Sequence, residues 1–146
     1  MVLEIPLLRL DPDLPMPSYA RPGDAGLDLV ARAGTILSPG GGRATIATGI
    51  ALRIPEGYAA LVLPRSGLAA RHGVTCLNAP GLIDPGYRGE VGVILVNTDS
   101  STPYEVHRGD RIAQLVISRA EVVHFVTVDS LDTSERGVGG FGHSGR

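Results

Sequence analysis

Short apolar stretches alternate along the chain with turns that contain glycine, proline or small polar residues. The stretches are rich in Val, Ile, Leu and Ala and are shorter than ordinary helices, which is typical of β-strands. The pattern predicts strands at residues 2–10, 43–52, 58–63, 74–77, 91–96 and 121–128, and in the apolar stretch around Gln114. Pro6 places the first strand at a sheet edge, because proline cannot donate to a neighbouring strand. The nearly all-apolar 58–63 stretch predicts a strand buried on both faces.

One stretch favours a helix. Residues 68–70 are Leu-Ala-Ala, Ser66 is placed to be the N-cap, and Gly73 is placed to end the helix. The unpaired N–H groups of a helix N-terminus, next to Arg65, would suit a phosphate group. Taken alone, the stretch is equally compatible with an ordinary helix cap beside a solvated arginine.

The most turn-rich stretch, residues 78–90, lies between two predicted strands. This arrangement predicts a hairpin with a shaped tip. Asn78, Asp84 and Tyr87 place an amide, a carboxylate and an aromatic ring in this turn, and loops on a rigid β scaffold often carry binding and catalytic groups. The structural alternative is a tight turn in which Asp84 bonds to its own backbone.

Three other stretches contain polar groups in unusual surroundings. Asp24 and Asp28 stand beside glycines, either as a turn entering a strand or as carboxylates near a cation. Gln114 interrupts an apolar strand and needs a hydrogen-bond partner, which is either backbone or ligand. The glycine-rich residues 134–146 cannot form stable secondary structure alone. They are either a disordered terminus or an arm that orders over an anionic, aromatic ligand, with N–H groups turned to its phosphates.

Composition narrows these possibilities. A length of 146 residues suits one domain, and 20 Gly with 11 Pro favour a turn-rich fold. The net charge of −2 argues against binding a nucleic acid polymer and leaves room for local basic sites. The single cysteine, Cys76, excludes an internal disulfide and is expected to be a buried apolar residue. There is no apolar run of transmembrane length and no signal peptide, so we expect a cytoplasmic protein without a membrane partner.

Five stretches stand in a fixed order and spacing over almost the whole chain: residues 24–29, 64–69, 78–90, 108–115 and 136–145. Together they resemble the five motifs of the trimeric dUTP pyrophosphatases (dUTPases). The resemblance implies an all-β fold, a distorted jelly roll or β-clip type barrel with one short helix. It implies a β domain over residues 1–133 and a flexible arm over residues 134–146 that closes an active site.

The resemblance also implies a function and an assembly. The activity is hydrolysis of dUTP to dUMP and pyrophosphate with Mg²⁺, which provides dUMP for dTMP synthesis and limits uracil in DNA. The assembly is a homotrimer with three active sites at subunit interfaces, each built from more than one chain.

Catalytic roles follow from the same resemblance. Asp84 resembles the general base that orients and deprotonates the water attacking the α-phosphorus. A carboxylate is a weak base, so its position and the neutralisation of phosphate charge by the metal must help it. Gln114 resembles the amide near the α-phosphate and the catalytic water. Asp28 resembles the acid that holds Mg²⁺ through its water shell.

Substrate-binding roles are implied in three groups. Tyr87 resembles the ring under the deoxyribose that leaves no room for a 2′-hydroxyl. Uracil would be held by the Asn78 amide and by backbone near Leu82, Ile83 and Gly92. A site matched to uracil would leave polar groups unpaired with cytosine. The phosphates would be bound by Arg65, Ser66 and Gly67. On the arm, the resemblance assigns Arg136 to the γ-phosphate, Phe141 to the uracil ring, and His143 and Ser144 to phosphate-facing positions.

Three alternatives differ in chemistry. The dCTP deaminases share the fold and carry a catalytic Glu after the hairpin, and matching Gly89 to their glycine puts Ile94 at that position, which cannot carry a proton. A non-catalytic trimeric nucleotide-binding regulator would be expected to lack Asp84 or the arginine of the arm. A purely structural jelly roll would leave Tyr87 and Arg65 unexplained.

Overall fold

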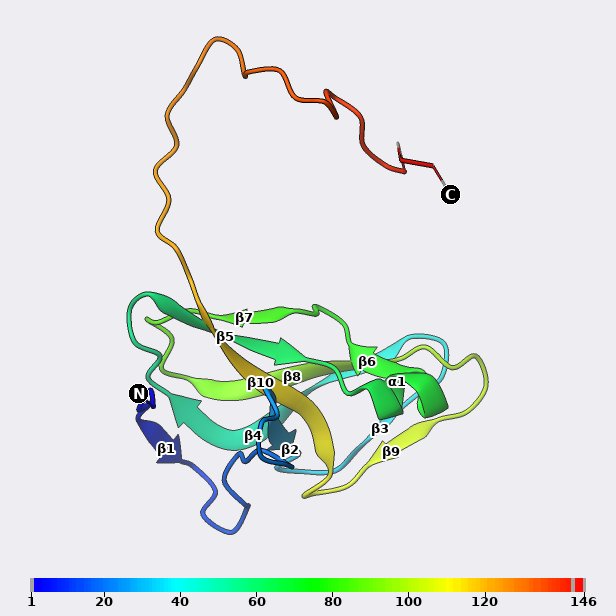
Figure 1. Ribbon diagram of the computed structural model, residues 1–146. Helices are drawn as coiled ribbons and strands as arrows, with labels where there is room; N and C mark the ends of the chain where they lie inside the picture. Colours follow the sequence, from blue (N-terminus) through cyan, green and yellow to red (C-terminus); the bar gives the residue numbers. More distant parts are fainter. Residues whose placement is uncertain (1, 143, 146) are drawn as a thin grey trace.

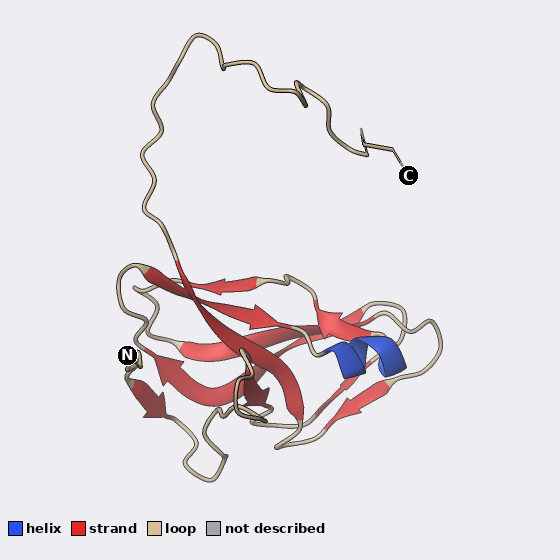
Figure 2. Ribbon diagram, in the orientation of Figure 1, coloured by secondary structure: helices blue, strands red, loops and turns tan. Residues whose placement is uncertain are grey.

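The described part of the chain folds as strands with one short helix (Figures 1 and 2). The computed structural model describes residues 2–142 and 144–145. In chain order the elements are β1 (Leu7–Arg9), β2 (Leu27–Val30), β3 (Thr35–Leu37), β4 (Gly42–Leu52), β5 (Tyr58–Leu63), α1 (Ser66–His72), β6 (Val74–Cys76), β7 (Gly81–Ile83), β8 (Glu90–Asn97), β9 (Tyr104–Val106) and β10 (Arg111–Arg119). The expected all-β fold with one short helix is confirmed.

The strands form two four-stranded antiparallel sheets and one small ribbon. The sheets have the orders β1-β4-β8-β6 and β2-β10-β5-β7, and β3 pairs with β9. From β4 to β8, successive strands alternate between the two four-stranded sheets. Alternation of this kind wraps a chain into a jelly roll, in which the inner faces of the two sheets enclose one core.

The core draws its largest buried side chains from both sheets. Leu29 in β2 and Ile112 in β10 come from one sheet and Leu95 in β8 from the other, and each is at most 1% exposed. Full burial of such a side chain contributes about 1.5–3 kcal/mol. Cys76 is also buried, as expected, and burial raises the pKa of its thiol to about 11.

One predicted strand boundary and one predicted burial need correction. β1 covers Leu7–Arg9 and not residues 2–10, although it lies at a sheet edge as Pro6 indicated. β5 forms as predicted, but Tyr58, Leu61 and Leu63 remain partly exposed, so it is not buried on both faces throughout.

The prediction that Ser66 is the N-cap of the helix was wrong. The helix begins at Ser66, and the extended residue before it, Arg65, is the N-cap without a side-chain hydrogen bond. The chain stays extended through Arg65 and becomes helical at Ser66, so the helix starts one residue earlier than a serine cap would require. Gly73 ends the helix in a left-handed conformation with φ of 64°, as predicted.

The turn-rich stretch is more than a hairpin. β6 and β8 pair antiparallel, as predicted, with Cys76 opposite Leu95. Between them, however, β7 crosses to the other sheet and pairs with β5, with Leu61 opposite Leu82. The apolar β7 segment buries Ile83 in the core, and this burial favours the crossing. The turn that carries Asp84 is therefore anchored to both sheets.

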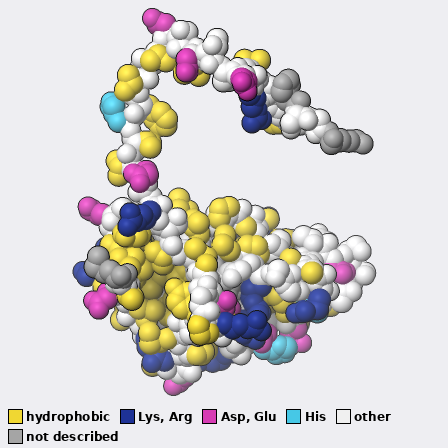
Figure 3. All heavy atoms as spheres, viewed as in Figure 1, with side chains coloured by type: hydrophobic (Ala, Val, Ile, Leu, Met, Phe, Trp, Pro, Cys, Tyr) yellow, Lys and Arg dark blue, Asp and Glu magenta, His cyan; other side chains and the backbone are white. Residues whose placement is uncertain are grey.

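The predicted last strand at 121–128 does not form within the chain. After β10 ends, the described residues are exposed, with the exception of a partly buried Gly139, and the segment extends away from the body (Figure 1). Val122 and Phe125 are 96% and 89% exposed. A strand needs a neighbour for its hydrogen bonds, and the chain supplies none to this segment. Figure 3 shows apolar side chains along this segment and on the face of the body near the N-terminus.

Among the residues described, no helix has the length and apolar character needed to cross a membrane.

Candidate active site

Five of the predicted site residues line one polar cavity of about 490 Å³. These residues are Asp28, Arg65, Ser66, Gly67 and Gln114. They come from β2, from the β5–α1 junction and from β10. The structure thus brings together groups from three of the five sequence motifs.

The register of one sheet explains this grouping. β10 lies between β2 and β5, and Gln114 is opposite Asp28 on one side and opposite Leu63 on the other. Directly opposed residues in antiparallel strands project from the same face, so the carboxylate and the amide share one surface. The chain that leaves Leu63 passes through Pro64 into Arg65, which adds the guanidinium at the same end of the sheet.

The Gln114 side chain is held on two sides. Its Nε2 donates to the carbonyl oxygen of Pro64 at 3.0 Å. A Cβ at Gly26 would overlap the Gln114 Oε1, so glycine there leaves room for the amide in this position. The expectation that this amide has a partner is confirmed, and the partner is backbone.

Arg111 adds a second guanidinium to the cavity. Its Nη1 lies 3.5 Å from the Asp28 Oδ2, and its carbonyl oxygen accepts a hydrogen bond of 2.9 Å from Arg65 Nη1. The sequence pattern did not indicate a role for Arg111. Arg111 and Gln114 are three residues apart, and residues with that spacing in a regular strand face opposite sides. A bulge between Arg111 and Ala113 shifts the register with β2 and returns Arg111 to the face of Gln114.

Five other predicted residues line a second, smaller hollow of about 320 Å³, namely Leu82, Ile83, Asp84, Tyr87 and Gly92. The hollow lies between β7 and the beginning of β8. It includes Ile94 at the position where the deaminase alternative requires a glutamate.

The Asp84 turn is closed by backbone. The Tyr87 N–H donates to the Asp84 carbonyl oxygen at 3.1 Å, so the closure leaves the Asp84 carboxylate exposed at the hollow. The Tyr87 hydroxyl donates to the Glu90 carbonyl oxygen at 2.9 Å, and the ring lies over Gly89, where a Cβ would be 2.5 Å from that hydroxyl. Tyr87 is 46% exposed.

The two hollows are far apart in one chain. Ile83 lies opposite Ala60, which places Asp84 beside Ala59 at the beginning of β5. Arg65 follows the other end of β5, six residues after Ala59. At roughly 3.3 Å per residue the two positions are about 20 Å apart. A single chain does not bring the Asp84 turn to the arginine cavity.

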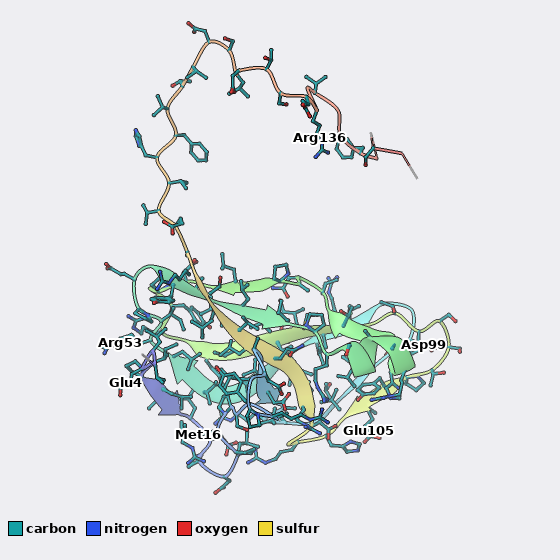
Figure 4. The ribbon with its side chains drawn as sticks, in the orientation of Figure 1. Glu4, Met16, Arg53, Asp99, Glu105 and Arg136 are labelled. Carbon is teal, nitrogen blue, oxygen red and sulfur yellow. The ribbon has the colours of Figure 1, made fainter. Side chains whose placement is uncertain are left out.

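The remaining predicted residues lie outside both hollows. Asn78 is exposed on the turn before β7, with its Nδ2 beside Gly81. Arg136, Phe141 and Ser144 lie on the extended C-terminal segment, and Figure 4 shows Arg136 well away from the body. His143 lies outside the described residues.

The carboxylates of the larger cavity fit a hard cation that keeps its water shell. Within residues 2–142 and 144–145, no three His, Cys, Asp or Glu side chains form a cage for a metal ion. Asp24 and Asp28 both line the cavity. Mg²⁺ commonly uses one or two carboxylates together with waters and substrate phosphates, so these residues suit that ion.

Comparison with known proteins identifies the family. The dUTPase family model matches residues 13–145. The deoxyuridine 5′-triphosphate nucleotidohydrolase of Thermobifida fusca is 60% identical over 143 residues, covering 98% of this chain and 79% of that protein. The corresponding protein of Nocardia farcinica is 53% identical over 141 residues, covering 97% and 85%. The chain therefore belongs to the dUTPase family.

Solved structures agree. A mutant dUTPase of Staphylococcus bacteriophage 80alpha, solved with dUpNHpp, is 28% identical with a TM-score of 0.88, covering 99% of this chain and all of that one. A mutant dUTPase from phage phi11 of S. aureus, described with a structural Mg(II) ion, is 25% identical with a TM-score of 0.79, covering 90% of this chain and all of that one.

Proposed function

We propose that this chain hydrolyses dUTP to dUMP and pyrophosphate with Mg²⁺, and so provides dUMP for dTMP synthesis and limits uracil in DNA. One observation carries the proposal: the cavity that gathers Asp28, Arg65, Ser66, Gly67 and Gln114 from separate motifs. The substrate follows from the activity in the names of relatives that are 60% and 53% identical.

A complete site in this proposal needs more than one copy of the chain. The Asp84 turn is about 20 Å from the arginine cavity along β5, so another subunit must supply it. The exposed apolar residues at 121–128 support the same conclusion, because a strand-like segment without a partner in its own chain can pair with a neighbour. The assembly proposed is a homotrimer with shared sites.

The larger cavity holds the triphosphate. The guanidinium groups of Arg65 and Arg111 attract the phosphate oxygens, and guanidinium geometry suits phosphate. Ser66 and Gly67 add a hydroxyl and a close backbone approach. Mg²⁺, held by Asp28 through its water shell, would neutralise phosphate charge when bound.

The hydrolytic step belongs to Asp84 and Gln114. The Asp84 carboxylate takes a proton from a water molecule, and the water oxygen attacks the α-phosphorus as the bond to the leaving pyrophosphate breaks. Gln114 Nε2 already donates to Pro64, which leaves its Oε1 to accept a hydrogen bond from that water. The fixed amide therefore orients the nucleophile.

The smaller hollow selects the nucleoside. The Asn78 amide, on the turn just before β7, and the backbone of the hollow near Leu82, Ile83 and Gly92 hold uracil, and cytosine would leave these polar groups unpaired. Tyr87 lies under the deoxyribose and leaves no space for a 2′-hydroxyl. The 134–146 arm closes the site, with Arg136 on the γ-phosphate, Phe141 over uracil, and His143 and Ser144 toward phosphate.

Pyrophosphate release from dUTP, dCTP, dTTP and UTP, measured side by side with Mg²⁺, tests this function. We expect release from dUTP and at least a hundredfold less from the other three, because a site matched to one hydrogen-bond pattern rejects others strongly. Conversion of dCTP to dUTP without pyrophosphate release would identify a deaminase. Binding of dUTP without turnover would identify a regulatory protein. Either result would overturn the proposal.

A further inference from the structure

Glu90 ties the Asp84 turn to the body of the protein. It is the first residue of β8, directly after the turn, and its side chain is 27% exposed. Both carboxylate oxygens accept from Arg32 Nη1, at 3.0 and 3.1 Å. The Oε1 also accepts from the backbone N–H of Gly49 at 2.8 Å. One side chain thus contacts two separate segments.

The Gly49 contact lies at an irregularity in β4. The register between β4 and β8 shifts between Ala47 and Ala51, and Gly49 there has a φ of +76°. The Glu90 carboxylate accepts the N–H that this bulge leaves without a ladder partner. Beside it, the Thr48 hydroxyl donates to the Val91 carbonyl oxygen at 2.7 Å. The start of β8 is therefore joined to the bulge by two side-chain bonds.

The Arg32 contact continues into a chain of opposite charges. Arg32 Nε lies 3.4 Å from the Asp11 Oδ2, and Arg108 Nη1 donates to the same oxygen at 2.6 Å. Arg108 also donates to the Arg32 carbonyl oxygen at 2.7 Å. The hydrogen bond from Arg108 is the main cause that lowers the pKa of Asp11 to about 2. The Asp11 carboxylate is therefore ionised at neutral pH and holds both arginines.

The Glu90 backbone holds Tyr87. Its carbonyl oxygen accepts from the Tyr87 hydroxyl at 2.9 Å. Almost half of the Tyr87 side chain is exposed, so packing alone does not fix the ring. The position of this hydroxyl depends on the position of the Glu90 peptide. The Glu90 side chain holds that peptide together with the pairing of Glu90 with Ala51 in β4.

We propose that Glu90 is a positioning residue for sugar selection: its carboxylate, held by Arg32 and Gly49, fixes the carbonyl group that places the Tyr87 ring. This inference rests on the proposed function, because it requires Tyr87 to lie under the deoxyribose. An isolated exposed ion pair contributes little to stability. The added bond to a backbone N–H and the direct connection to Tyr87 distinguish Glu90 from such a pair.

The test compares kcat/KM for dUTP and UTP in Glu90→Ala and Glu90→Gln. The ratio of the two values does not depend on how much protein is folded. We expect Glu90→Ala to lower the dUTP preference about tenfold, within the range seen when one pocket contact is lost. Glu90→Gln keeps an acceptor oxygen and should restore most of the preference. The control is Glu105→Ala, which removes a glutamate that forms an exposed pair with His107. This change should leave the dUTP preference unchanged.

A double-mutant cycle identifies the route. Tyr87→Phe removes the hydroxyl that Glu90 holds, so adding Glu90→Ala to it should cause little further loss of preference. Fully additive losses would overturn the proposed route through Tyr87. If the wild-type enzyme is selective and Glu90→Ala keeps the same dUTP preference, the role of Glu90 is overturned and the proposed function still stands. Wild-type enzyme that hydrolyses neither nucleotide would overturn the proposed function, and this inference with it.

Discussion

Gln114 and Asp84 differ in how firmly the fold holds their side chains. Gln114 is fixed by its bond to the Pro64 carbonyl and by the space that Gly26 leaves. Asp84 stands exposed on a turn that is closed through its backbone. The Gln114 amide is therefore fixed within one chain, whereas the position of the Asp84 carboxylate depends on how firmly its turn is held.

Asp84→Asn tests the proposed base. The amide has nearly the same shape but cannot take a proton from water, so we expect kcat to fall by about 10²–10⁴-fold. Binding of the non-hydrolysable analogue dUpNHpp, measured by calorimetry, should change little. Glu105→Gln, which removes an exposed charge in β9, serves as the control and should retain kcat. Near-normal turnover by Asp84→Asn would remove Asp84 from this role.

Asp11 gives the protein a defined sensitivity to acid. The hydrogen bond from Arg108 lowers the pKa of Asp11 from 3.8 to about 2 in the folded state. A lowered folded-state pKa stabilises the fold above pH 4, and this contribution is lost as the pH falls from about 4 to about 2. Asp11→Asn should therefore be less stable at neutral pH and lose less stability across that window. Urea unfolding at several pH values measures both slopes, and parallel slopes would contradict the assignment.

Among the elements, the sequence pattern predicted several strands whose neighbours lie in the same chain but missed the short β3–β9 ribbon. β4, β5, β6 and β8 form close to their predicted bounds, because each buries an apolar face within its own fold. The 121–128 segment has the same pattern and stays extended and exposed, since an apolar pattern does not show whether the fold supplies a neighbouring strand. The crossing of β7 and the bulge near Arg111 escaped prediction because both depend on tertiary pairing.

Two truncations separate the roles of the C-terminal segment. Removal of residues 136–146 deletes the arm motif, and we expect turnover to be lost while the trimer remains. Removal of residues 120–146 also deletes the unpaired apolar stretch, and we expect the trimer to weaken as well. Sedimentation velocity and pyrophosphate release measure the two properties. If removal of residues 136–146 alone dissociates the proposed trimer, the arm is structural.

At the scale of the whole molecule, the candidate site is divided. Three of the five motifs place Asp28, Arg65 and Gln114 in one cavity. The other two place the Asp84 turn at the opposite end of β5 and Arg136 away from the body. Linear order along a sequence cannot reveal this division, which follows from strand register and from the length of β5. The family resemblance implies shared sites, and the separation of the two hollows in one chain supports that proposal.

Mixed trimers test this division most directly. Arg65→Ala and Asp84→Asn chains are each expected to be inactive alone. If Arg65 and Asp84 of one site come from different subunits, unfolding and refolding an equal mixture should give about one intact site in four by random assembly. Pyrophosphate release from dUTP should then recover to about a quarter of the wild-type rate. If both residues serve a site from the same chain, the mixture will stay as inactive as its components, and the account of a shared site is wrong.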